Sequence, residues 1–155
     1  VYNDAFRARL PTPALRRLYD YWNLLREGRP MPARRDVDPV EIPDLLPNIV
    51  LLDVVGGQPR RFRLRLMGTA ITDRLGENTG RYLDDIGLGT AYGEIAANYG
   101  KCVRTREPAF SESDYLTEAR KYVRVWRLAL PLSDNGQDVN IVLVGLFFRE
   151  SLDAE

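Results

Sequence analysis

The sequence predicts an α+β fold in which a block of helices interrupts a sheet of five antiparallel strands after its second strand. Apolar residues recur at helical spacing near the N-terminus and again around residue 95, whereas five other segments show the alternating or continuous apolar pattern of strands. The pairs Gly56-Gly57 and Asn135-Gly136 each separate two of these segments, which is typical of β-hairpins. With 155 residues, the chain is long enough for one domain with its own core.

The first 48 residues are expected to form an amphipathic helix followed by an extended connector. Thr12 is a suitable N-cap before Pro13, and Gly28 suits the end of the helix. Three prolines between residues 29 and 39 favour an extended backbone. The apolar stripe of the helix must be buried, either as a cap on its own domain or as a contact with a second copy or a partner. The stripe consists of Leu15, Leu18, Tyr19, Trp22 and Leu25.

Residues 49–150 are expected to hold the sheet and the helical block, and to form one globular unit with the first 48 residues. The second strand alternates with period two, so Phe62, Leu64 and Leu66 are expected to share one face. The last strand is apolar on both alternating faces, which predicts a central position with both sides covered. The expected elements are short helices at 39–46, 69–75 and 82–86, a longer helix at 90–105, and strands at 49–55, 61–67, 109–115, 122–132 and 139–148.

The composition excludes several classes of function. The chain has no histidine, which rules out histidine-based catalysis, histidine-ligated haem and most catalytic zinc sites. Lys+Arg and Asp+Glu both number 22, and this balance argues against a nucleic-acid partner. Cys102 is the single cysteine, which excludes an intrachain disulfide and fits a reduced, cytoplasmic setting. No carboxylate spacing indicates a metal site, and no apolar run is long enough to predict membrane insertion.

Four groups of short motifs follow one another along the chain: Tyr21-Trp22, Pro32-Ala33-Arg34 with Asp38-Pro39, Arg65-Leu66-Met67-Gly68-Thr69, and Gly76 with Thr79-Gly80-Arg81. Together with the order of helices and strands, these motifs resemble the PAS domain, in particular a bacterial group of stand-alone PAS proteins. The resemblance extends from about Leu15 to Phe148. It implies a PAS-like sheet with the strand order 2-1-5-4-3 and a sensory function.

The competing fold is a cystatin-like cone that begins with a helix, but a helical block between the second and third strands fits it poorly. In that fold the chain would be a small isomerase or hydrolase with a buried acid in an open pocket, for which Asp53 and Glu112 are the candidates. Ser111 and Ser113 have no base nearby in any recognisable motif. We therefore expect no enzyme and assign no catalytic residue.

The resemblance implies a small-molecule pocket between the helix at 90–105 and the sheet. Arg65 and Arg124 stand out because each alternates with apolar neighbours on a strand that should be covered. A buried arginine needs a counter-charge, either Glu112 or Asp114 on a neighbouring strand, or the carboxylate or phosphate of a ligand. The aromatic residues and the cysteine of these elements either line the pocket or fill the core. The predicted ligand contacts are Arg65, Tyr99, Cys102, Tyr115, Arg124 and Trp126.

We expect a cytoplasmic sensory domain that acts through a homodimer or a signalling partner and responds to a small organic molecule. No cofactor is expected: covalent flavin chemistry in PAS relatives needs an Asn-Cys-Arg-Phe motif, whereas Cys102 lies in Gly100-Lys101-Cys102-Val103-Arg104. No output domain is visible in the sequence, so a partner is expected to deliver the response. The alternative is a protein-interaction module with a filled core and no ligand.

Overall fold

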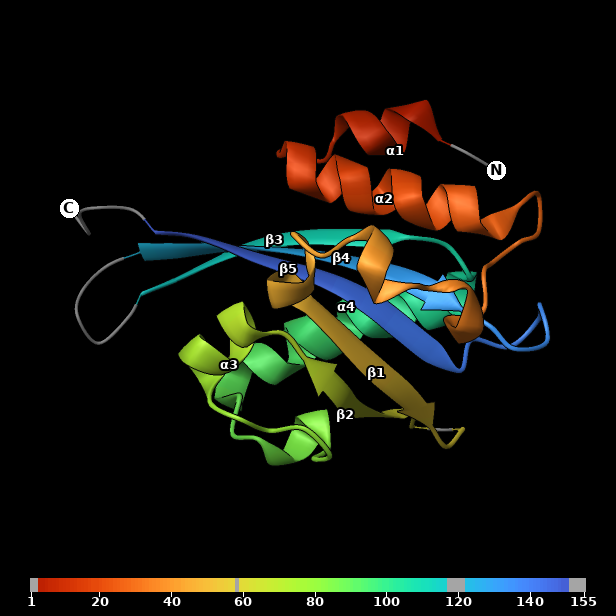
Figure 1. The fold of residues 1–155 in the computed structure, drawn as a ribbon. Helices are drawn as coiled ribbons and strands as arrows, with labels where there is room; N and C mark the ends of the chain where they lie inside the picture. Colours follow the sequence, from red (N-terminus) through yellow and green to blue (C-terminus); the bar gives the residue numbers. More distant parts are fainter. Residues whose placement is uncertain (1–2, 58, 117–121, 151–155) are drawn as a thin grey trace.

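The computed structural model describes residues 3–57, 59–116 and 122–150, and within these ranges five antiparallel strands form a sheet (Figure 1). The strand order is β2-β1-β5-β4-β3, which confirms the predicted α+β fold and the order that the PAS resemblance implied. The last strand lies in the centre, as its apolar sequence predicts. The strands are β1 (Ile49–Val55), β2 (Arg61–Met67), β3 (Ala109–Leu116), β4 (Tyr122–Leu132) and β5 (Ile141–Glu150).

The helical block lies between β2 and β3 in the chain, as predicted, and two helices precede the sheet. α2 (Pro13–Arg26) begins after Thr12, whose hydroxyl accepts a hydrogen bond from the Leu15 N–H. A five-residue helix, α1 (Asp4–Ala8), precedes it; the sequence does not predict α1, which is too short to show an apolar period. The other helical segments are α3 (Thr69–Leu75), α4 (Tyr92–Thr105) and the 3₁₀ turns η1 (Arg34–Asp36), η2 (Pro39–Glu41), η3 (Leu46–Asn48), η4 (Leu83–Asp85) and η5 (Gly89–Ala91).

Two local predictions are wrong for identifiable reasons. The short helix expected at 39–46 is absent and is replaced by η2 and η3, because Pro43 has no N–H to donate and its ring obstructs a continuous helix. Leu66 does not share a face with Leu64, because the β1–β2 register shifts between Leu51 and Leu52 and leaves Leu66 41% exposed. Within the described ranges no helix has the length and apolar character needed to cross a membrane.

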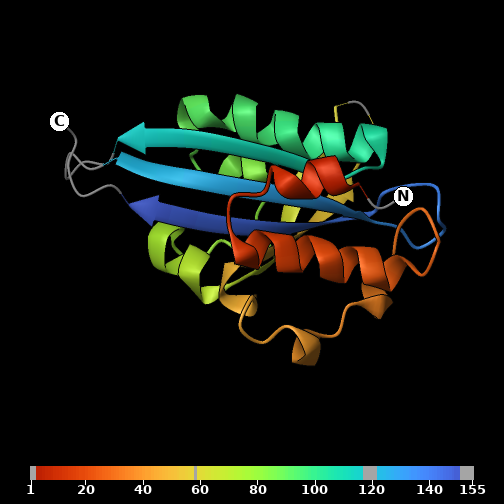
Figure 2. The same cartoon turned by 90° about the horizontal axis from the view of Figure 1, so that it is seen from above.

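α2 covers one face of the sheet, which we name the outer face (Figures 1 and 2). Leu15, Leu18, Tyr19 and Trp22 of its apolar stripe are all buried there. The Trp22 indole N–H donates a hydrogen bond of 2.9 Å to the Pro131 carbonyl of β4. The stripe therefore forms the cap on the chain's own domain.

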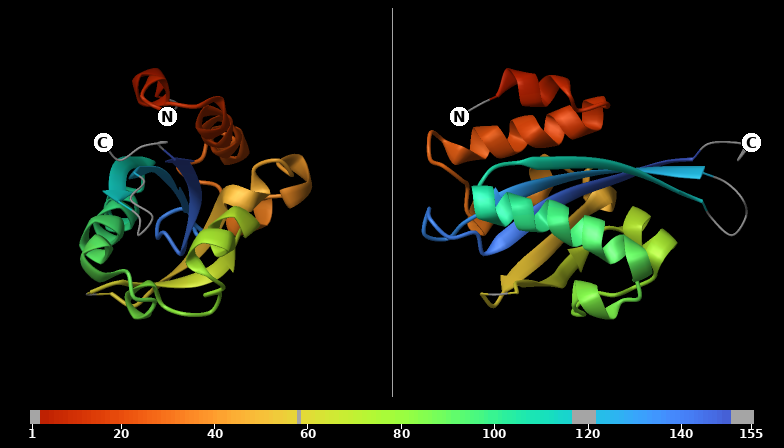
Figure 3. Two further views of the ribbon diagram at one scale, coloured as in Figure 1. Left: turned by 90° about the vertical axis from the view of Figure 1, so that its left-hand side faces the viewer. Right: turned by 180° about the vertical axis from the view of Figure 1, so that it is seen from behind.

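α4 covers the opposite face, which we name the inner face, and the sheet curls so that both of its edge strands approach this helix (Figure 3). Tyr99, Cys102 and Val103 of α4 are buried against the sheet. The Tyr99 ring makes an edge contact with Phe62 of β2, with ring centroids 5.7 Å apart. Because burying an apolar side chain of this size contributes about 1.5–3 kcal/mol, apolar burial is the main force that holds both helices on the sheet.

The connector between α2 and β1 is tied to the sheet at both ends. The Ser133 N–H donates to the Pro32 carbonyl at 2.9 Å, and the Asn48 side-chain amide donates to the Leu146 carbonyl at 2.9 Å. Gly68, the N-cap of α3, packs directly on the end of the connector, where an added Cβ would lie 2.3 Å from the Pro47 carbonyl oxygen. Only glycine fits at this contact between the connector and the helical block.

Replacing Gly68 with alanine is expected to lower the free energy of unfolding by at least about 1–3 kcal/mol, because the methyl group must displace backbone rather than a flexible side chain. The matched control is Gly93→Ala in α4, where no heavy atom lies within 4 Å of an added Cβ. That change should leave stability unchanged or raise it by up to about 1 kcal/mol. Urea unfolding of both variants measures the difference, and equal stability of Gly68→Ala and the wild type would contradict the assigned contact.

Candidate functional site

Side chains of β4 alternate between the two faces of the sheet, and this alternation decides which residues can reach α4. Leu128 lies opposite Gly145, whose α-carbon faces Leu18 of α2, so Leu128 lies on the outer face together with Trp126 and Arg124. The intervening residue, Arg127, points to the inner face, where its Nε donates to the Tyr99 hydroxyl.

The residues predicted to contact a ligand therefore lie in separate places. Tyr99 and Cys102 are on α4 at the inner face, whereas Arg124 and Trp126 are on the outer face of β4. Arg65 lies beside the bulge near the edge of the sheet and is exposed. The side chain of the sixth residue, Tyr115, lies outside the described residues. The six do not form one site.

Arg124 and Trp126 are bound by acids of the chain itself. The Arg124 guanidinium forms a two-pronged contact with Asp114, at 2.9 and 3.0 Å, and lies 3.2 Å from Glu112. The Trp126 indole N–H donates to the other oxygen of Glu112 at 2.9 Å. The Arg124 guanidinium holds the pKa of Asp114 below its ordinary value. The sequence left two kinds of counter-charge open for Arg124: an acid on the neighbouring strand, or the carboxylate or phosphate of a ligand. In the structure the counter-charge comes from Asp114 and Glu112 on the neighbouring strand.

Arg65 also has an internal partner. Its guanidinium lies 3.1 Å from one oxygen of Asp53, and Arg63 lies 2.9 Å from the other oxygen. Asp53 and Glu112, the two candidate acids for an enzyme of the cone-shaped fold, thus bind side chains of the chain on its outer face. Neither acid is presented to the inner face under α4.

Arg127 is the arginine that does reach the inner face, and it is 6% exposed. Its Nε donates to the Tyr99 hydroxyl at 3.1 Å, and its guanidinium carbon lies 5.8 Å from the centre of the Tyr99 ring. No other side-chain hydrogen bond and no carboxylate partner is found for Arg127 among the described residues. A buried guanidinium is normally paired with an acid. Arg26, the other arginine among the buried residues described, also lacks an acid, but its guanidinium donates to both the Asn23 side chain and the Arg29 carbonyl, whereas Arg127 has the Tyr99 hydroxyl alone.

Two further polar side chains on the elements around Arg127 each have a buried oxygen atom, and Ser111 as a whole is half-buried. Ser111 of β3 is the direct cross-strand neighbour of Arg127 and shares its face. Asn98 precedes Tyr99 on α4 and is 8% exposed. The Ser111 Oγ and the Asn98 Oδ1 have no hydrogen-bond partner in the described part of the chain. We name Asn98, Tyr99, Ser111 and Arg127 the inner-face polar cluster; it combines one positive charge with unused hydrogen-bonding capacity.

Sequence reasoning missed Arg127, although a signal for it was present. Arg127 alternates with Val125 and Ala129, which are also buried, whereas Arg124 alternates with Tyr122 and Trp126. Small aliphatic neighbours two positions away in each direction favour a covered face for Arg127. The placement of α4 is what shows that Arg127, rather than Arg124, is enclosed. Ser111 and Asn98 carry no comparable signal, since single polar residues on a strand or a helix are usually solvated.

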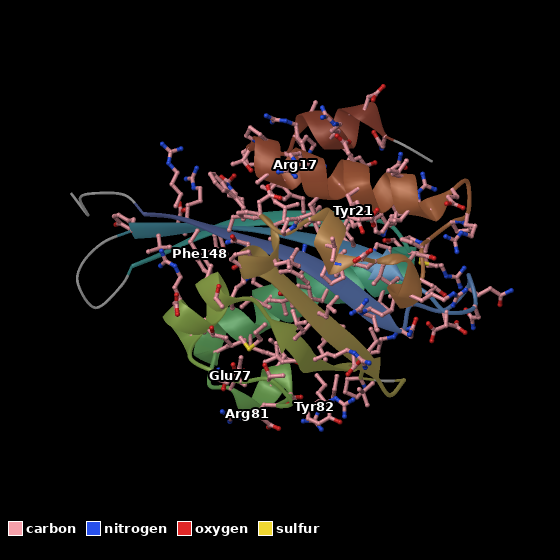
Figure 4. The ribbon with its side chains drawn as sticks, viewed as in Figure 1. Arg17, Tyr21, Glu77, Arg81, Tyr82 and Phe148 are labelled. Atoms are coloured by element: carbon pink, nitrogen blue, oxygen red, sulfur yellow. The ribbon has the colours of Figure 1, made fainter. Side chains whose placement is uncertain are left out.

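The segment after α3 covers the free edge of β2. The Leu64 N–H donates to the Arg81 carbonyl at 2.9 Å, and Arg61 lies over the Tyr82 ring at 3.8 Å while binding Asp84 at 2.7 Å. Figure 4 shows Arg81 and Tyr82 on this segment beneath the sheet, and Phe148 at the far end of β5. The Arg61 guanidinium lowers the pKa of Asp84 below its ordinary value. These contacts protect an edge strand that would otherwise be open to pairing with other chains.

The sequence matches the family model of the PAS domain over residues 10–147. The chain belongs to the PAS domain family. Among solved structures it is similar to a LOV protein of Rhodobacter sphaeroides, with 9% identity, 72% of this chain and 68% of that chain covered, and a TM-score of 0.49. It is also similar to the PAS domain of BvgS from Bordetella pertussis, with 20% identity, coverages of 71% and 84%, and a TM-score of 0.46. No curated protein sequence matches the chain.

As a PAS domain, the chain is a sensory or signalling module, which confirms the family that the sequence motifs resemble. PAS domains are in general sensory rather than enzymatic. The matched region begins inside the N-terminal segment and includes α2, so the cap belongs to the family pattern.

Cys102 of this PAS domain lies at the centre of the α4 interface with no exposed surface. Burial raises the pKa of its thiol well above the ordinary value, so the thiol remains protonated near neutral pH. A buried, protonated thiol is neither a nucleophile nor an accessible target for oxidation.

The folded protein is therefore expected to react with a thiol reagent at pH 8 only through unfolding. The labelling rate should rise in step with the unfolded fraction as urea is added, and it should match the rate of a free thiol only in the denatured protein. Mass spectrometry after timed labelling measures both rates. Rapid, complete labelling of the native protein without denaturant would show that Cys102 is exposed.

Proposed function

We propose that this PAS domain senses a small organic anion, which binds on the inner face under α4 through the Arg127 guanidinium. The supporting observation is a buried arginine with no carboxylate partner among the described residues. An uncompensated charge in a protein interior is strongly destabilising, so a contribution to fold stability does not account for it. A carboxylate or phosphate group of a ligand would supply the missing negative charge in a two-pronged contact.

The other members of the inner-face polar cluster are suited to the same anionic group. The Ser111 hydroxyl can donate to an oxyanion from the strand beside Arg127, and the Asn98 amide can donate through its NH₂ group once its side chain turns. Cys102, Val125 and Ala129 are buried on the same elements and offer an apolar surface to the remainder of the ligand. Small-molecule sites usually have this composition, with a few polar groups in a mostly apolar lining.

β4 is the element through which binding would be transmitted to α2. Arg127 is followed by Leu128, which lies on the opposite face beside Gly145, and Gly145 packs closely on Leu18 of α2. A small displacement of β4 on the inner face therefore changes the packing of the cap on the outer face. We assign α2 the role of output element, with its solvent side, including Leu24 at 72% exposure, as the contact for a homodimer or a signalling partner.

The cytoplasm is the proposed setting, because a single reduced cysteine is typical of proteins kept in a reducing compartment. The competing function is a protein-interaction module with a filled core and no ligand. The two functions differ in one measurable property, which is whether the native protein holds a small molecule at Arg127.

Native mass spectrometry of protein purified without denaturation tests the proposal. An added mass that disappears on denaturation, or a rise in melting temperature with one member of a panel of small carboxylates and organic phosphates, is the expected result. A ligand at about 100 times its dissociation constant stabilises by about 2.7 kcal/mol, which is readily measured. The apo mass alone, with no response across the panel, would favour the interaction module. The same spectra report whether the homodimer forms.

Arg127→Met separates ligand binding from folding. Because methionine removes the unpaired charge while keeping an unbranched apolar stem, the ligand-free variant should be as stable as the wild type or more stable, by up to about 1–4 kcal/mol. The same variant should lose the added mass and the thermal response. The matched control is Arg124→Met on the outer face of the same strand, which removes an exposed ion pair, should cost no more than about 1 kcal/mol and should retain binding. A ligand response that survives Arg127→Met would overturn the assignment.

A further inference from the structure

A groove at the end of α4 is lined by three arginines that come from two separate parts of the chain. Its volume is about 360 Å³, and it lies between the β1–β2 turn, the last turn of α4 and the β4–β5 turn. Arg60 precedes β2, Arg104 lies in the last turn of α4, and Arg106 is the C-cap of that helix. No member of the inner-face polar cluster lines this groove.

These three arginines differ from most others in the described chain. Most other arginines in the described chain have an ion pair or a side-chain hydrogen bond, as Arg61 has with Asp84 and Arg16 has with the Leu10 carbonyl. In contrast, the side chains of Arg60, Arg104 and Arg106 have no ion pair and no hydrogen bond with any described residue.

The groove has one acid in its described lining, and it does not neutralise the arginines. This acid is Asp138, whose carboxylate accepts a hydrogen bond of 3.2 Å from the Asn135 side chain. The groove therefore has an excess of positive charge, whereas the whole chain has a net charge of zero.

Helix electrostatics account for only part of this arrangement. A basic side chain near the C-terminus of a helix interacts favourably with the helix dipole, which is sufficient to explain Arg104 and Arg106. It does not explain Arg60, which belongs to another element, nor why the three charges face one concavity. Like charges that face a common groove repel one another, and a bound anion would relieve that repulsion.

We propose that this groove binds a compact molecule that bears two or more negative charges on phosphate or carboxylate groups. Its volume falls within the range of about 300–1,000 Å³ that is typical of small-molecule sites. Each guanidinium group can bind two oxygens of one phosphate or carboxylate. Three guanidinium groups can therefore contact a multiply charged head group from different sides. Gln137, whose side chain has no hydrogen-bond partner among the described residues, adds a neutral donor to the same lining. The site is independent of the ligand proposed for Arg127.

The test is titration calorimetry with inorganic pyrophosphate and with citrate, at an ionic strength of about 10 mM, where charges interact over about 30 Å. The two probes distinguish a phosphoryl preference from a carboxylate preference, and binding of either one supports the site. The test variant is Arg104→Gln with Arg106→Gln, which should weaken binding by about tenfold. The matched control is Arg35→Gln with Arg149→Gln, which removes the same charge from two exposed arginines that lie outside the groove and have no hydrogen bond or ion pair with a described residue.

The control should bind within about twofold of the wild type, because only general electrostatics change. Equal weakening of test and control would show diffuse attraction by the whole surface and would overturn the site, as would no heat of binding for either anion. Binding of a hexaglutamate peptide without binding of either small anion would assign the groove to an acidic protein segment and overturn the small-molecule proposal. Urea unfolding of each variant checks that the fold is retained. Arg127→Met should leave these titrations unchanged, so failure at one site is distinguishable from failure at the other.

Discussion

Burial of both faces of β4 and β5 is the constraint on which the other parts of the structure depend. The outer face needs α2, and Gly145 lets that helix approach closely enough for Leu18 to be fully buried. The inner face needs α4, which places Cys102 and Val103 against the sheet. Neither helix is stable alone at its length, so both owe their positions to apolar burial on the sheet. The N-terminal cap and the sheet consequently form one packed body.

The same constraint makes the position of each charge on β4 informative. Arg124 lies where the outer face is open to solvent, and exposed acids on β3 neutralise it. Arg127, three residues later, lies under α4 among apolar side chains, where Tyr99 is the one hydrogen-bond partner found in the described chain. An exposed ion pair needs no function to explain it, because its contribution to stability is close to neutral. A buried, unpaired guanidinium costs free energy, and a ligand that pairs with it is the simplest reason for its presence.

The sequence predicts most of the fold but only part of the candidate site. Hairpin signals at Gly56-Gly57 and Asn135-Gly136 and the cap at Thr12 are local, and the structure confirms the elements they delimit. The bulge beside Leu52 and the close contact at Gly68 depend on neighbours distant in sequence, which periodicity cannot show. The site was harder because Arg65, Arg124 and Arg127 all alternate with apolar residues, and only the placement of the helices shows which of them is enclosed.

A crystal structure of the protein purified without denaturation locates the atoms around the Arg127 guanidinium and so shows directly whether a ligand binds there. We predict oxygen atoms of a non-protein carboxylate or phosphate at about 2.7–2.9 Å from the Arg127 Nη atoms, with the Ser111 hydroxyl or the Asn98 amide in hydrogen-bond range of the same group. An Arg127 side chain paired with a carboxylate of the chain itself would contradict the proposed ligand site. So would a guanidinium turned to solvent, with apolar side chains of α4 closed over β4.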